Sequence, residues 1–187
     1  MLQNLIAIIA IAVVIVLWVR ATQRKLVMLD ENVRNAMSQI GVQLSSRFDA
    51  LMQLLDLTKD YSRNDIKILI ETIQSRRTVI TVKSTADDVI CQEGLISEAL
   101  FKIEMVTEQY PELKTSPNYI KTMDAVQTFD NMVRTSRLIY NDSVAKLNQE
   151  IRMFPVSMIA GVLGFRKRDY LDDQGTKAGI SSIKRVA

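Results

Sequence analysis

The sequence has very few of the residues from which active sites and β-sheets are built. Its 187 residues include no histidine, one cysteine, six glycines and three prolines. Without histidine there is no imidazole base, no Ser-His-Asp or Cys-His pair and no imidazole metal ligand. One cysteine excludes an internal disulfide and a cysteine zinc cage. Sheet-rich folds need turn residues about every 8–12 positions, so the shortage of glycine and proline favours an all-α protein.

The charge balance excludes a further class of function. The 24 lysines and arginines are nearly matched by 21 aspartates and glutamates, which leaves a net charge of +3. This excess is too small to imply a nucleic-acid partner. Together with the missing histidine, it predicts a protein that is not an enzyme, with no catalytic residue, no metal and no cofactor.

Residues 1–20 are expected to be a transmembrane anchor. Every residue from Leu5 to Val19 is apolar, and the whole segment approaches the ~20 residues that cross a ~30 Å hydrocarbon core. Trp18 lies where an interfacial aromatic residue is expected. A cleaved signal peptide is the alternative, but no basic residue precedes the apolar run, and the run continues well past Ala10 and Ala12, which have the spacing of a cleavage site.

Basic residues next to the anchor predict its orientation. Arg20, Arg24 and Lys25 follow the apolar run directly, whereas no lysine or arginine precedes it. Cytoplasmic flanks carry the excess of basic residues. We therefore expect a single-pass protein of the cell membrane, with its N-terminus outside and the rest of the chain in the cytoplasm.

Four helices are predicted after the anchor, because apolar residues recur there at three- and four-residue steps. Capping residues, prolines and a β-branched run over 78–82 set their expected ends. The expected helices cover 21–61, 62–83 with a cap at Ser62, from Asp87 or Asp88 to 110, and 117–154. They predict a long antiparallel four-helix bundle over residues 21–165. The remainder, 166–187, is rich in Gly, Ser, Lys and Arg and is expected to be a mobile basic tail.

The last of these helices has the most regular pattern. Ser116 and Pro117 suit the N-cap and the first helical position. Eleven residues from Ile120 to Phe154 keep the three- and four-residue spacing, and Pro155 ends the helix.

Three stretches of sequence carry recognisable motifs. The first predicted helix contains N-A-x-x-Q-I-x-V-Q-L over 35–44 and R-F-D over 47–49, and a stretch from Glu93 to Leu113 ends in Y-P-x-L. From Asp130 to Phe165 an acidic residue is followed by R-x-x-Y-N, F-P and a small apolar run that closes with G-F. Together these stretches resemble the LemA family of bacterial membrane-anchored helical proteins.

The resemblance extends over nearly the whole chain from the anchor to Phe165. Two departures are visible: Met52-Gln53 stands where the family usually has Pro-Asn, and Asp130 stands where Glu is common. The resemblance implies a single-span anchor and an antiparallel helical bundle. It implies no established enzymatic activity.

Charged residues on the predicted apolar seams form the first candidate site. Glu93, Asp130 and Arg137 fall on the seams of their helices, and Arg47 lies at the edge of its own. Charges in a helical core are tolerated when they are paired, and they fix register more than they add stability. We therefore predict a structural polar network. The alternative, a carboxylate pair for acid–base catalysis or metal binding, is disfavoured because neither histidine nor a glycine-rich loop accompanies these residues.

The second candidate site is the apolar segment 153–165, where Ser157 is the only polar side chain. It is too short to cross a bilayer. It could fold back to cap the bundle, or it could lie in the membrane interface with the following basic residues on anionic headgroups. Four helices that alternate in direction would bring Phe154 close to Arg20. The predicted membrane-proximal set is Trp18, Arg20, Arg24, Lys25, Phe154, Phe165, Arg166, Lys167 and Arg168.

These observations favour a non-enzymatic membrane scaffold. The expected protein self-associates and organises or shapes the bacterial membrane, with the lipid bilayer and further copies of itself as partners. The alternative is an adaptor or regulatory binding module for another membrane protein, such as a protease or a sensor. The size of complexes formed by the purified full-length protein would separate the two.

Overall fold

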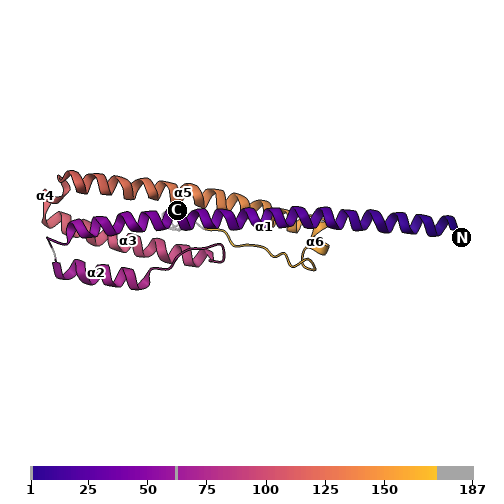
Figure 1. The fold of residues 1–187 in the computed structure, drawn as a ribbon, viewed down its shortest axis with the longest axis horizontal. Helices are drawn as coiled ribbons and strands as arrows, with labels where there is room; N and C mark the ends of the chain where they lie inside the picture. The colour runs from indigo at the N-terminus through magenta and orange to yellow at the C-terminus, as the bar shows by residue number, and fades with distance from the viewer. Residues whose placement is uncertain (1, 62, 172–187) are drawn as a thin grey trace, which may run out of the picture.

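The computed structural model describes residues 2–61 and 63–171 of the chain. All regular secondary structure in these residues is α-helical, which confirms the predicted all-α class. The helices in chain order are α1 (Leu2–Thr58), α2 (Arg63–Arg76), α3 (Ala86–Gln109), α4 (Pro111–Lys114), α5 (Pro117–Arg152) and α6 (Val156–Ile159) (Figure 1).

The predicted anchor and the first predicted helix are one continuous helix, α1. Its 57 residues contain no proline to interrupt the hydrogen-bond ladder, and at ~1.5 Å per residue it is about 85 Å long. Its N-terminal part is apolar and long enough to cross a membrane, and the side chains of that part are not buried by the rest of the protein. In Figure 1 this part of α1 extends alone beyond the other helices.

The core is built mainly between α1 and α5, which are in contact over most of the length of α5. Lys25 pairs with Glu150 and Arg47 pairs with Asp130, so the two helices run in opposite directions. Helix α3 also packs on α1, and α2 contacts both α1 and α3. Buried residues recur along the inner faces of the three longest helices: Val33, Ile40, Leu44, Leu51 and Leu55 on α1, Ile96 and Ile103 on α3, and Val126, Val133, Tyr140 and Leu147 on α5.

Helix α2 is shorter than predicted, because it ends at Arg76 and not near Lys83. The side chain of Gln92 on α3 replaces the next helical turn. Its Nε2 donates to the carbonyl of Arg76 at 3.2 Å, and its Oε1 accepts from the backbone N–H of Thr78 at 3.0 Å. The β-branched residues that follow belong to an irregular segment outside the helices, 77–82, which we call the strap.

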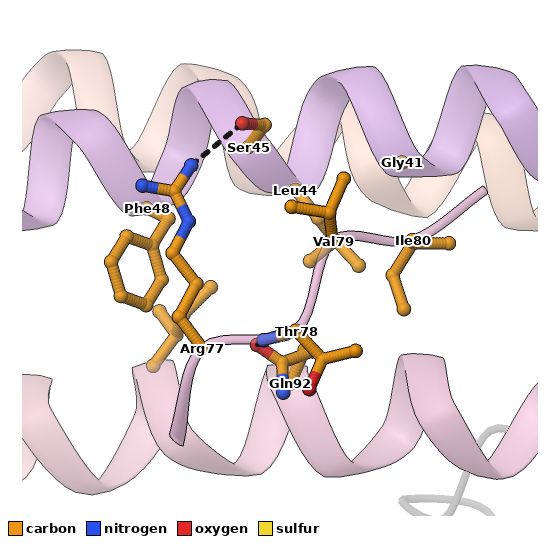
Figure 2. A pocket seen from close by; sticks show the side chains of 10 residues that line it. Gly41, Leu44, Ser45, Phe48, Arg77, Thr78, Val79, Ile80 and Gln92 are labelled. Atoms are coloured by element: carbon orange, nitrogen blue, oxygen red, sulfur yellow. Dashed lines mark hydrogen bonds between the residues drawn. The ribbon is translucent and has the colours of Figure 1, made fainter. Parts of the chain in front are cut away.

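Close packing against α1 holds the strap in place. Ile80 is buried, and its backbone carbonyl lies against Gly41 (Figure 2). A Cβ atom on Gly41 would overlap that carbonyl oxygen. Glycine is therefore required here for close approach, although it lies inside a helix.

Helix α3 begins earlier than predicted, at Ala86. Thr85 is its N-cap, and Asp88 completes a capping box: the Asp88 N–H donates to Thr85 Oγ1, and the Thr85 N–H donates to Asp88 Oδ2 at 2.7 Å. Hydrogen bonds from the Thr85 backbone and side chain lower the pKa of the Asp88 carboxyl. Asp88, predicted as a possible first residue, is instead the acidic partner of the cap.

The remaining helices end within three residues of their predicted ends: α1 ends at Thr58, α3 at Gln109 and α5 at Arg152. Pro117 occupies the first turn of α5 and Ser116 precedes it as N-cap, as predicted. The predicted seam of this helix is wrong at both ends. Ile120 is exposed, because Tyr119 is buried in its place, and Phe154 is exposed beyond the end of α5. Pro111 not only follows α3 but also opens the short α4. The cap predicted at Ser62 lies outside the described residues.

Candidate functional site

The structure brings the four predicted seam charges together in two ion pairs that join three helices. Arg47 on α1 lies 2.9 Å from Asp130 on α5, measured from Nη2 to Oδ1. Arg137 on α5 donates from Nη1 to Oε2 of Glu93 on α3 at 2.8 Å. The network therefore connects α1 to α5 and α5 to α3.

Burial is the largest influence on the charges of this network. Desolvation lowers the pKa of the Arg47 guanidinium, although Asp130 and Glu93 oppose the shift. Desolvation likewise raises the pKa of the Glu93 carboxyl against the opposing effect of Arg137. Arg47 Nε is buried without a hydrogen-bond partner in the part of the chain that the structure describes. The attraction within such a pair mainly offsets the cost of desolvating its two charges. The pairs therefore fix how the helices align more than they stabilise the fold.

The geometry gives the two carboxylates of the network structural partners. Glu93 pairs with Arg137, and Asp130 pairs with Arg47 and more distantly with Arg134. Among residues 2–61 and 63–171, no three His, Cys, Asp or Glu side chains are grouped so that they could hold a metal ion. That the protein is not an enzyme and needs no metal or cofactor stays a prediction.

Two asparagines on α5 form a site that the sequence analysis missed. Asn148 donates from Nδ2 to the carbonyl of Arg168 and accepts the Arg168 N–H on Oδ1, each at 2.9 Å. Asn141 makes the same two bonds with Leu171, again at 2.9 Å. Tyr140 donates its hydroxyl to the carbonyl of Asp169 at 3.0 Å. We call Asn141 and Asn148 the asparagine clamp.

The spacing of the clamp matches the segment that it holds. Seven residues of helix, from Asn141 to Asn148, span about 10.5 Å at ~1.5 Å per residue. Three residues of extended chain, from Arg168 to Leu171, span about 10 Å at ~3.3 Å per residue. Each side-chain amide can therefore pair with the backbone as a neighbouring strand would.

The clamp corrects one expectation about the tail. Residues 166–171, predicted as the start of a mobile tail, lie along α5, and Leu171 is buried. The rest of the predicted tail, 172–187, lies outside the described residues. The signal in the sequence was Tyr140-Asn141 and Asn148 on the face of α5 that carries the apolar seam, since a buried amide side chain needs hydrogen-bond partners.

The predicted membrane-proximal residues are placed by two ion pairs. Lys25 lies 2.7 Å from Glu150, and Arg168 donates to Asp30 at 2.9 Å. Arg20, Arg24, Arg166 and Lys167 are exposed, and Trp18 lies on the apolar part of α1. Arg168 is exposed as well, but Asp30 on α1 binds its side chain and Asn148 of the clamp binds its backbone.

The segment 153–165 packs on the helices with one face, as the capping alternative predicts, and whether its other face meets lipid stays a prediction. Val156 and Ala160 are buried, and Leu163 and Phe165 pack partly against the core. Phe154, Met158 and Val162 are strongly exposed. One face of the segment thus covers the end of the helices, while the other presents apolar side chains outward. Gly164 has a φ of +84°, which favours glycine at the turn into the tail.

Comparison with known proteins gives one family and a small group of relatives. Residues 36–182 match the model of the LemA family, and the match continues past Phe165 into the tail. Magnetosome proteins MamQ 1 and MamQ 2 of Paramagnetospirillum magneticum are each 27% identical to this chain over 82 residues. Magnetosome protein MamQ of Magnetospirillum gryphiswaldense is 24% identical over 82 residues. The aligned stretch covers 44% of this chain and 30% of the length of each relative. Because the family model covers most of the sequence, the chain belongs to the LemA family.

Proposed function

We propose that this protein is a non-enzymatic membrane scaffold that self-associates and organises or shapes the bacterial membrane. In this proposal residues 1–20 cross the cell membrane once with the N-terminus outside. Residues 21–165 then form an antiparallel four-helix bundle in the cytoplasm. LemA family membership and the similarity to proteins named for the magnetosome support the proposal.

The observation that carries the proposal is the continuity of α1. The helix passes without a break from an exposed apolar stretch into the packed core, where Val33, Ile40 and Leu51 are buried. A flexible tether would let the cytoplasmic part move independently of the lipid. A continuous helix instead fixes the bundle to the membrane span, so copies that associate through their bundles would also align their spans.

Exposed apolar side chains offer surfaces for that association. Phe101 on α3 and Val42 on α1 are each more than half exposed. Neither lies on the apolar part of α1 that we assign to lipid. Exposed apolar surface on a folded protein often marks a contact with another protein.

Self-association is tested with the purified full-length protein in lipid nanodiscs and vesicles, with complex size measured by mass photometry. The proposal expects homo-assemblies that grow with protein density and change the shape of vesicles in electron micrographs. A strictly monomeric protein that leaves vesicles unchanged would contradict it. The orientation is tested separately, because protease added to intact cells should not digest a C-terminal reporter.

A second candidate function is an adaptor, which one groove favours. The groove, about 390 Å³, lies between α2 and α3 and is lined by Ile66, Ile68, Leu69, Met105 and Val106 among others. Ile68 and Met105 are exposed, and an amphipathic helix of a partner could pack there. A monomer that retains a membrane protein on pulldown, and loses it in the Ile68→Asp variant, would favour the adaptor over the scaffold.

A further inference from the structure

An exposed apolar stripe follows α5 at the end of the molecule nearest the predicted membrane span. Phe154 is 78% exposed, Met158 is 70% exposed and Val162 is 88% exposed. Their spacing of four residues alternates with Val156 and Ala160, which are 8% and 1% exposed. The segment 153–165 is therefore amphipathic, and its apolar outer face is much more exposed than a soluble surface requires. We call Phe154, Met158 and Val162 the stripe.

The register between α1 and α5 gives the depth of the stripe. Lys25 pairs with Glu150, and α5 continues toward the N-terminal end of α1 up to Arg152. Arg152, the last residue of α5, lies two residues past Glu150, about 3 Å at ~1.5 Å per residue, and Phe154 follows it after one extended residue. The stripe therefore begins only a few residues from Val19, where the apolar run ends. In Figure 1, α6 lies beside α1 where α1 begins to extend alone.

The charges at this level are predominantly positive. Arg20, Arg24, Arg152, Arg166 and Lys167 are all exposed. Of the carboxylates nearby, Glu150 pairs with Lys25 and Asp30 pairs with Arg168, while Glu31 and Asp169 are exposed, so cations outnumber free carboxylates. An apolar stripe surrounded by cations has the character of a segment that lies in the interface of an anionic membrane.

Both ends of the segment are fixed, so the stripe does not depend on a free tail for its position. Helix α5 holds the start of the segment, and Asn148 of the clamp holds Arg168 just beyond its end. The buried side chains of Val156 and Ala160 hold its middle. This preorganised geometry lowers the entropy cost of presenting three apolar side chains to lipid.

We propose that the stripe inserts into the interfacial region of the membrane leaflet that faces the bundle, and that this leaflet is anionic. The inference rests on the proposed membrane anchoring through α1 and adds a second, shallow lipid contact beside it. Because the stripe enters one leaflet only, each copy would expand that leaflet relative to the other. A second copy of the chain covering the stripe is the competing occupant, and it would exclude lipid.

The test measures lipid contact at single positions of the full-length chain. Cys91 is replaced by serine, and one cysteine is introduced by Val162→Cys or, as the matched control, Leu138→Cys. Leu138 is 67% exposed on α5, but its register places it far from the span. Each variant carries a nitrobenzoxadiazole label and is reconstituted into phosphatidylglycerol-containing vesicles with lipids that carry a nitroxide group on the acyl chain, which quench both the label and tryptophan on contact.

The expected result is quenching at position 162 that exceeds quenching at position 138 several-fold. Quenching at position 162 should fall at least two-fold when phosphatidylcholine replaces phosphatidylglycerol. It should fall as much in the Arg166→Gln/Lys167→Gln variant. Equal quenching at the two positions would overturn the inference. It is also the result expected if a second copy of the chain covered the stripe. Quenching at 162 that ignores lipid charge would overturn the anionic preference. Trp18, the single tryptophan, reports the anchor: if it is quenched and position 162 is not, the anchoring stands and this inference alone fails.

Discussion

Replacing Gly41 with alanine should destabilise the protein, although alanine is the better helix former. Gly41 lies inside α1 and buried against the strap, where its missing Cβ leaves room for the backbone carbonyl of Ile80. In a free helix the change from Gly to Ala stabilises by about 1 kcal/mol. Here the new methyl group would overlap a backbone atom, which cannot rotate away as a side chain would. The strap must therefore move off α1.

The contacts of the strap set the size of the loss. Exposing the Ile80 side chain costs about 1.5–3 kcal/mol. The two hydrogen bonds of Gln92 to Arg76 and Thr78 contribute about 0.5–1.5 kcal/mol each. After the helix-propensity gain is subtracted, the free energy of unfolding should fall by roughly 2–5 kcal/mol. For a chain of this length that corresponds to a decrease in Tm of roughly 5–15 °C.

The assay is thermal unfolding of the full-length protein in detergent micelles, with hydrogen exchange of the strap amides as the local measurement. Gly94→Ala on α3 is the matched control, because a Cβ at Gly94 would meet nothing within 4 Å. That variant should be unchanged or stabilised by up to about 1 kcal/mol. If Gly41→Ala is as stable as Gly94→Ala, or if its strap amides keep their protection, the close approach of the strap to α1 is wrong.

Three further predictions follow from the polar network and the clamp. Arg137→Ala should lower the free energy of unfolding by about 1–3 kcal/mol, since it leaves the half-buried Glu93 without its ion-pair partner. Adding Glu93→Gln should recover most of the lost Tm, and an unchanged Tm in Arg137→Ala would refute the pairing. Burial raises the pKa of Glu93 above its ordinary 4.5, so the folded state binds the proton more tightly, and the free energy of unfolding should fall as pH rises through that raised pKa. The Glu93→Gln variant should lack this fall when unfolding is measured at a series of pH values, and the same pH dependence in both proteins would contradict the prediction. Asn148→Ala should speed amide exchange at residues 166–171 by about 5–30-fold, the effect of one or two kcal/mol. The control Asn118→Ala, on the exposed first turn of α5, should have no effect. Protection that survives in Asn148→Ala would show that the clamp does not hold the segment.

The long helices were predictable because their patterns are local and repeated. Helix α5 keeps its spacing over many turns, and Pro117 marks its start. The gathering of the seam charges was also predictable, because a charge on a buried face needs a partner. Which arginine meets which carboxylate was not, since Arg47 could reach either Glu93 or Asp130 until the three helices were aligned in space.

The strap and the docked tail could not be predicted for a common reason. Each depends on amide side chains that bind backbone groups from a distant part of the chain. Gln92 ends α2, and Asn148 holds Arg168, but a backbone group has no sequence signature that a pattern could match. For the strap, the glycine at position 41 was an available signal, because a helix-interior glycine carries a cost that close packing can justify.

In the proposed membrane orientation, the unbroken course of α1 would transmit any tilt of its membrane span to the far end of the helix. Beyond residue 20 the helix is about 57 Å long at ~1.5 Å per residue. A change in span tilt of ~20°, of the kind with which helices adapt to bilayer thickness, would displace the far end of the helix sideways by roughly 20 Å. Helix α2 begins near that far end (Figure 1), and its residues line one side of the groove between α2 and α3. In the proposed orientation, a difference of a few ångströms in lipid thickness would thus become a much larger displacement of the groove, the surface that we propose for a partner.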